Sequence, residues 1–318
     1  MSSRASITVG TLARTWLHNR FATSELTLPL SLAAGLALWL TTTDWHVLVW
    51  LLPMALVGTF CFLEMNIRLA FIRVRTRILS SLFWFGLPIL LIPIILSQQS
   101  AVEWQHAFVG LLVPVSLLLF LTYDRHEPVS LVFHIFAMLG VVAVVCPPLA
   151  VCIPLHLLHL IIYMRVRSAR VFAAAFLGLL LVSPLVLVFP IDLSILTDYQ
   201  FTLYPTYLLG WGILCLVTLV AANYYLRQSY DDKISIRMMY HVVIWQWLVA
   251  QALALAFPTF SFPLLIATWV YATPLISHQI ALSRSRLTTW WFVGLLLACV
   301  AIQTIHQLDI PILPLLTF

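Results

Sequence analysis

The sequence contains little charge. Only 8% of its 318 residues are Asp, Glu, Lys or Arg, whereas 63% are hydrophobic. A soluble domain usually carries about a quarter charged residues, and a soluble fold of this length could not bury so much apolar surface. Instead, uncharged stretches of about 20 residues recur along the chain, which is the length that a helix needs to cross about 30 Å of hydrocarbon.

Two other architectures are excluded by what the sequence lacks. The apolar stretches are apolar all round and do not alternate with the period of two that a transmembrane barrel requires. The cysteines are odd in number and lie inside or at the ends of apolar stretches, so no disulfide framework is expected. They are Cys61, Cys146, Cys152, Cys215 and Cys299. We therefore expect an all-α polytopic membrane protein without a soluble domain.

The usual motifs of metal and pyrophosphate chemistry are also missing. That chemistry normally uses carboxylates in pairs, and the sequence contains no DxD, DDxxD or NDxxD motif. We therefore expect no metal, no cofactor and no catalytic residue, and an enzyme is the less favoured interpretation.

The apolar stretches predict eleven transmembrane helices. They are expected at residues 26–43, 47–66, 78–97, 104–123, 129–146, 149–164, 171–189, 203–225, 238–257, 261–282 and 288–305. An amphipathic segment at 1–25 would then lie in the cytoplasmic interface, 26–305 would form one transmembrane domain, and 306–318 would be a short outer tail.

The positive charges predict the orientation of these helices. If the N-terminus is cytoplasmic, all 16 Lys and Arg residues fall on the cytoplasmic side, as the positive-inside rule expects. An arginine at the centre of a bilayer costs about 2.5–3.5 kcal/mol, so clustered arginines hold a loop at the surface. The predicted anchors are Arg73, Arg75, Arg77, Arg165, Arg167, Arg284 and Arg286. The C-terminus would then lie outside.

Glu64 and Arg68 are four residues apart, which predicts an ion pair on one helix face. Intramembrane proteases that process prenylated proteins have two adjacent Glu residues before such an Arg, and a Phe-x-x-x-His motif. Here Leu63 precedes Glu64, and no histidine has Phe four positions earlier. That activity is excluded.

Polar side chains inside apolar stretches are the candidates for a substrate site. We expect a cavity lined by His134, His156, His159, His241, Gln246 and His278, because buried polar groups in membrane helices are functional candidates by default. Hydrogen bonds between helices are the alternative role, each worth only about 0.6 kcal/mol on average.

Two stretches carry a resemblance to a known family. The sequences "RFATSELTLPL" at residues 20–30 and "NIRLAFIRVRTRILSSLF" at 66–83 resemble a family of uncharacterised multi-helix inner-membrane proteins from Bacteroidota. The resemblance covers the first third of the chain and implies a bacterial inner membrane as location. It implies no activity.

Three functions are compatible with these features. The favoured hypothesis is a carrier or flippase for a small molecule or lipid, with the bilayer as its partner. A scaffold that binds other membrane proteins is the alternative, and a transferase acting on a lipid-linked substrate is the second alternative. A nucleic-acid partner is not expected.

Overall fold

The computed structural model describes residues 17–74, 76–97, 104–123, 129–163, 165–166, 168–188, 205–283, 285–286, 288–290 and 292–294, and contains no strand in these ranges. Its main helices are α1 (Leu17–Thr23), α2 (Thr27–Thr42), α3 (Trp45–Leu69), α4 (Ile78–Ser97), α5 (Ala107–Thr122), α6 (Val129–Val145), α7 (Cys152–Ile162), α8 (Ala169–Val182), α9 (Leu185–Val188), α11 (Pro205–Gln228), α12 (Ile234–Ala256) and α13 (Ser261–Leu282). Short 3-10 helices precede or join several of them: η3 (Trp104–His106), η4 (Pro147–Val151), η5 (Ser229–Asp231) and η6 (Pro258–Phe260).

The predicted apolar stretches coincide with helices. Every stretch up to residue 282 overlaps one, and the stretch predicted at 261–282 has the same bounds as α13. Most of the last predicted crossing, 288–305, lies outside the described residues, as do the tail 306–318 and residues 1–16 of the predicted interfacial segment.

The prediction of eleven crossings is not supported. Within the described residues, five helices are long and apolar enough to cross a membrane, or six if α1 and α2, bent by 95°, form one broken span. Helices α6 and α7 have 17 and 11 residues. Since a helix rises about 1.5 Å per residue, even α6 is shorter than about 30 Å of hydrocarbon. An apolar stretch predicts a helix but does not fix its length or straightness.

The outer surface of the bundle is apolar, as expected of helices that face lipid. On α8, Phe176, Leu177 and Leu181 are each more than half exposed. Large exposed apolar surfaces are uncommon on soluble monomers. The helical class and the apolar exterior together indicate a protein embedded in a membrane.

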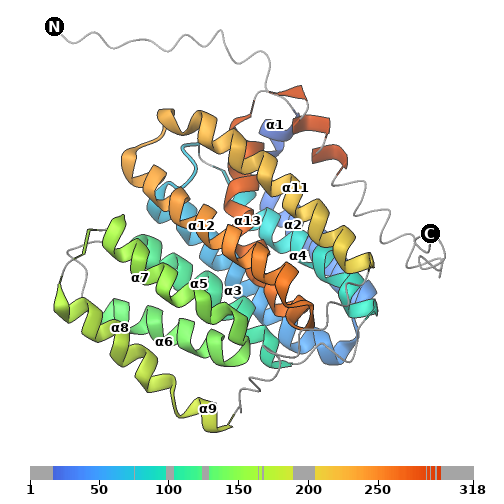
Figure 1. The fold of residues 1–318 in the computed structure, drawn as a ribbon. Helices are drawn as coiled ribbons and strands as arrows, with labels where there is room; N and C mark the ends of the chain where they lie inside the picture. Colours follow the sequence, from blue (N-terminus) through green and yellow to red (C-terminus); the bar gives the residue numbers. More distant parts are fainter. Residues whose placement is uncertain are drawn as a thin grey trace, which may run out of the picture.

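Helix α13 is the centre of the bundle. Every residue from Ser261 to Ala281 is buried, and α13 packs against α1, α4, α5, α11 and α12 (Figure 1). Two of its hydroxyls are satisfied within the helix: Thr268 and Thr273 donate to the carbonyls of Leu264 and Trp269 at 2.8 and 2.7 Å. The helix can therefore be enclosed without unpaired hydroxyl groups at these two positions.

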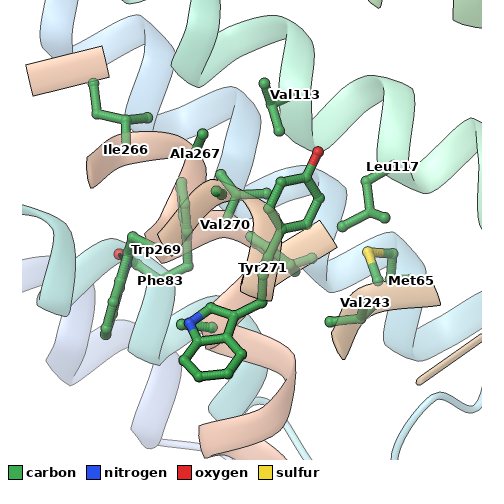
Figure 2. Close-up of a cluster of buried hydrophobic side chains, with 14 of the residues drawn as sticks. Met65, Phe83, Val113, Leu117, Val243, Ile266, Ala267, Trp269, Val270 and Tyr271 are labelled. Atoms are coloured by element: carbon green, nitrogen blue, oxygen red, sulfur yellow. Dashed lines mark hydrogen bonds between the residues drawn. The ribbon is translucent and has the colours of Figure 1, made fainter. Parts of the chain in front are cut away.

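Close packing around α13 depends on a glycine in α4. A Cβ atom at Gly86 would lie 2.1 Å from the Trp269 ring. The indole N–H of Trp269 donates to the carbonyl of Phe83 at 3.2 Å, so the side chain is both packed and satisfied. Figure 2 shows the surrounding core, where Val270 and Tyr271 of α13 lie among apolar side chains of neighbouring helices.

Helices α6 and α8 form a flank beside this centre. They pack extensively against each other, and α6 also packs on α5 (Figure 1). At the α6–α8 crossing, a Cβ atom at Gly178 would lie 2.4 Å from the backbone carbonyl oxygen of Phe133. Small residues allow such close approach between membrane helices.

Contacts between distant segments bring the basic loops to one end of the bundle. Arg73, between α3 and α4, pairs with Asp231 of η5 at 3.2 Å. Asn19 of α1 donates to the carbonyl of Ala281 at 2.9 Å, and Thr76 donates to the carbonyl of Ala22. We call this the basic end: the ends of α3, α5, α7 and α13, the start of α12, and the described residues of the loops at 70–77, 163–168 and 229–233.

His18 fastens α1 to the basic end. Its Nε2 lies 2.9 Å from the carbonyl oxygen of Ser283, and its Nδ1 lies 2.7 Å from Oγ1 of Thr289. Because a carbonyl only accepts, Nε2 carries the proton and Nδ1 accepts from the Thr289 hydroxyl. The neutral ring is therefore fully paired, and burial lowers the pKa of His18 below its ordinary value.

We expect Gly178→Ala to destabilise the protein by about 1–3 kcal/mol, because the added methyl group meets backbone that cannot rotate away. Gly212→Ala is the matched control, since no atom lies within 4 Å of its added Cβ. Thermal unfolding in detergent measures both. Equal unfolding temperatures for the two variants would contradict the close α6–α8 crossing.

We expect α1 to loosen on acidification. A lowered folded-state pKa means that the stability from neutral His18 is present above about pH 6.5, the ordinary value for histidine, and is lost as the pH falls through the folded-state pKa. The protection factors of the α1 amides, which correct for the slower intrinsic exchange at lower pH, should decrease between neutral and mildly acidic pH. His18→Gln should abolish this dependence, whereas the exposed-site control His46→Gln should retain it.

Candidate functional site

A pocket opens at the basic end of the bundle, where α3, α5, α7 and α12 meet. Its volume is about 620 Å³, within the range of about 300–1,000 Å³ usual for small-molecule sites. Most of the wall is apolar. The lining residues are Leu69, Leu121, Thr122, Tyr123, Tyr163, Arg165, Ile234, Ser235, Met238, Met239 and Val242. We call this the end pocket.

Arg165 is the charged residue of the end pocket, and its backbone conformation is unusual. Its φ is 51°, and the N–H of Val166 donates to the carbonyl of Leu160 at 3.0 Å. Arg165 follows α7, whose C-cap is Tyr163, and a left-handed position of this kind is most often occupied by glycine. A left-handed L-residue costs about 1–2 kcal/mol. None of the described carboxylates lies within ion-pair distance of Arg165.

A string of polar rings leads from the end pocket into the bundle. Tyr163 stacks on His241 of α12 with centroids 6.0 Å apart and planes at 3°. On its own side, Tyr163 lies 5.4 Å from the ring of His159. His159 is 6.5 Å from His156, and the Nε2 atom of Gln246 lies 2.8 Å from His156 Nδ1. The string therefore connects α7 with α12 between the pocket wall and the buried His156.

The hydrogen bonds of His156 fix its tautomer. Nδ1 lies 2.7 Å from the carbonyl oxygen of Cys152, which only accepts, so Nδ1 carries the proton. The amide of Gln246 then faces Nδ1 with its oxygen, since the nitrogen and oxygen of an amide are interchangeable in such assignments. The Nε2 atom of His156 remains a buried acceptor without a hydrogen-bond partner in the described part of the chain.

A second polar cluster lies at the basic end around His278. The side chains of His278 and Asp232 are 1% and 3% exposed, and Nε2 of His278 donates to Oδ2 of Asp232 at 3.3 Å. Tyr225 and Tyr240 stack with centroids 4.1 Å apart, and each ring meets His278 edge-on at 5.0 and 5.2 Å. Arg73 Nη1 lies 4.0 Å from Asp232 Oδ1. A buried carboxylate thus lies among aromatic rings.

Sequence reasoning missed Asp232. Two adjacent aspartates, Asp231 and Asp232, follow the tyrosine-rich end of α11, but a charged turn is typical of a solvated connection. Asp231 follows that expectation, with a side chain 65% exposed, whereas Asp232 points inward. The neighbouring "NYY" of α11 was the available indication that this turn lies against polar aromatic residues.

The structure brings together only part of the predicted substrate site. Four of the six candidates, His156, His159, His241 and Gln246, belong to the string described above. His278 lies in the separate Asp232 cluster, and His134 is exposed on α6 beside the ring of Phe133. None of the six lines the end pocket. Whether they bind a substrate stays a prediction.

The remaining predicted residues lie as follows. Arg68 Nε is 2.6 Å from Glu64 Oε2, so this ion pair is present. Of the predicted anchors, Arg73 pairs with Asp231, Arg165 lines the end pocket, and Arg77 and Arg286 are exposed. Arg75, Arg167 and Arg284 lie outside the described residues. In the described part of the chain, no group of three or more His, Cys, Asp or Glu residues could hold a metal ion.

No family model matches the chain, and neither a curated protein nor a solved structure shows similarity to it. The resemblance to inner-membrane proteins of Bacteroidota therefore stays a prediction.

We expect Asp232→Ala to cost far more stability than Glu64→Ala. Removing one member of a buried pair costs about 3–5 kcal/mol, whereas an exposed pair contributes at most about 1 kcal/mol, and the Arg68 side chain is 67% exposed. Thermal unfolding in detergent compares the two variants. Similar unfolding temperatures would show that the Asp232–His278 pair is hydrated in solution.

Proposed function

We propose that the protein is a carrier of the flippase type that moves an anionic amphiphile, a molecule with an apolar chain and a phosphate or carboxylate head, across a bacterial inner membrane. The observation that carries this proposal is the end pocket, whose described lining combines a mostly apolar wall with Arg165 and so matches the two parts of such a molecule. Guanidinium groups bind phosphate and carboxylate through paired, charge-assisted hydrogen bonds.

The backbone at Arg165 supports a binding role for this side chain. Glycine would be the most stable residue at this position after α7, because it adopts φ near 51° without steric cost. Strain of this kind is typical of functional positions.

The string of rings between α7 and α12 provides a route beyond the end pocket. Unpartnered polar atoms of His156, His159 and Gln246 lie along it, in the described part of the chain. A carrier needs polar groups at membrane depth that become accessible when helices separate. In this proposal, the head group passes along these side chains while the apolar chain stays against the bundle.

The orientation follows from the positive-inside rule. The basic end carries Arg20, Arg73, Arg165, Lys233 and Arg286, so we place it at the cytoplasmic surface of the membrane. The end pocket then faces the cytoplasmic leaflet, with Arg165 at the depth of the lipid head groups. An N-terminus on the cytoplasmic side belongs to the same proposal.

The transferase alternative is less favoured by the pocket chemistry. Group transfer at a phosphate normally needs carboxylates that hold a metal or move a proton at the reacting atoms, and no carboxylate is among the described residues that line the end pocket. Asp231 and Asp232 are instead engaged with Arg73 and His278. Binding without chemistry agrees better with this arrangement.

The test uses purified full-length protein in phosphatidylcholine vesicles that contain fluorescent NBD-phosphatidylglycerol. Dithionite bleaches only the outer leaflet, so bleaching of the inner pool measures translocation. We expect wild type to translocate this lipid, and Arg165→Gly to slow it about tenfold or more, since a hydrogen bond to a charged group contributes about 1.5–3 kcal/mol. NBD-phosphatidylcholine, which has no net charge, should cross more slowly than NBD-phosphatidylglycerol.

Ala70→Gly is the matched control. Ala70 also adopts a left-handed conformation, with φ 47°, but does not line the end pocket. Both glycine variants should unfold at a higher temperature than wild type, so loss of translocation in Arg165→Gly alone cannot come from misfolding. If Arg165→Gly translocates the lipid at the wild-type rate, the assigned role of Arg165 is refuted. If wild type does not translocate the lipid at all, the carrier function is refuted.

A further inference from the structure

We propose that the buried Asp232–His278 pair binds a proton and that this proton is the coupling ion of the carrier. The proposal rests on the proposed function and names the ion that function would use. A carrier driven by an ion gradient needs a group that can gain or lose that ion inside the protein. In the described part of the chain, Asp232 is the one buried carboxylate.

The hydrogen bonding of the pair supplies a path for the proton. His278 donates Nε2–H to Asp232 Oδ2 at 3.3 Å, and its Nδ1 atom has no partner in the described ranges. A proton that arrives at the Nδ1 lone pair makes the ring cationic, and the Nε2 proton can then pass to Asp232. The result is a neutral carboxylic acid and a neutral imidazole that carries its proton on Nδ1. One proton has entered from water, and the net charge of the pair has changed from −1 to zero.

The groups around the pair come from four elements besides α13. Those that are charged or titratable are Arg73 of the α3–α4 loop, Asp231 of η5, Tyr224 and Tyr225 of α11, and Arg237 and Tyr240 of α12. The hydroxyls of Tyr225 and Tyr240 are buried without hydrogen-bond partners in the described residues. A buried site with unpaired donors is poised to rearrange when the charge of its carboxylate changes.

The proton would be coupled to the end pocket through Arg73. Arg73 contacts Asp231 at 3.2 Å and Asp232 at 4.0 Å, which ties the α3–α4 loop to the turn before α12. Leu69, four residues before Arg73, and Ile234, two residues after Asp232, both line the end pocket. Protonation removes one of the two charges that hold Arg73. The electrostatic attraction between the α3–α4 loop and the turn before α12, on this side of the pocket, is therefore weaker in the protonated state.

The experiment compares lipid translocation with and without a pH gradient in the same vesicles. We expect a gradient to change the initial rate of NBD-phosphatidylglycerol translocation by wild type about tenfold, within the usual range of coupling between two sites. Asp232→Asn cannot gain the proton and should lose the effect, whereas Asp232→Glu keeps a carboxyl group and should restore it. Glu64→Gln is the control, because it removes an acid at the same end that belongs to a different ion pair.

A second measurement needs no translocation. Infrared difference spectra of the full chain between neutral and acidic pH should show the C=O stretch of a protonated carboxyl group that Asp232→Asn lacks and Glu64→Gln retains. Absence of that band would overturn the proton site, whether or not the protein moves lipid. If wild type translocates the lipid at a rate that does not depend on the pH gradient, the proton coupling is wrong but the carrier function stands. If the carboxyl band is present and wild type does not translocate the lipid, the proton site is supported and the carrier function is refuted.

Discussion

The enclosure of α13 is the constraint on which the rest of the bundle depends. A polar side chain on a buried helix is costly unless it is paired internally or with the helices around it. Thr268 and Thr273 pair with their own backbone, Trp269 with a carbonyl of α4, and His278 Nε2 with Asp232. The last two bonds fix α4 and the turn before α12 relative to α13.

The same helix links the core to the basic end. Its last turn carries His278, and the residues that follow receive α1 through His18. Arginines remain in the loops because the free-energy cost of moving them into hydrocarbon exceeds the stabilisation that packing would provide. Positive charge therefore collects where α13 ends, and a pocket formed there necessarily lies beside cations.

Much of the secondary structure was predictable from apolar stretches. The stretches predicted at 78–97 and 261–282 coincide with α4 and α13, because in such sequences apolar length alone indicates a helix. The number of spans was not predictable, since the 95° bend between α1 and α2 and the 11 residues of α7 depend on packing between helices. Hydropathy along the chain does not contain that information.

The candidate site was predictable only in part. Embedded histidines led to the string from His156 to His241, because polar groups in apolar stretches stand out by composition. Asp232 did not stand out, since its burial depends on α11, α12 and α13 meeting around it. Arg165 was predicted as an anchor, and its place in the wall of a pocket depends on how α3, α5, α7 and α12 pack together.

The contact of α1 with the segment after α13 has a consequence for the order of assembly. His18 and Ser283 are separated by 265 residues, and ribosomes add about 5–20 residues per second, so the two ends can meet only after roughly 15–50 s of synthesis. During that interval, α2 to α5 must remain in place without the central helix, against which α4 and α5 later pack. Helix α1 can therefore dock only after the last quarter of the chain has been synthesised.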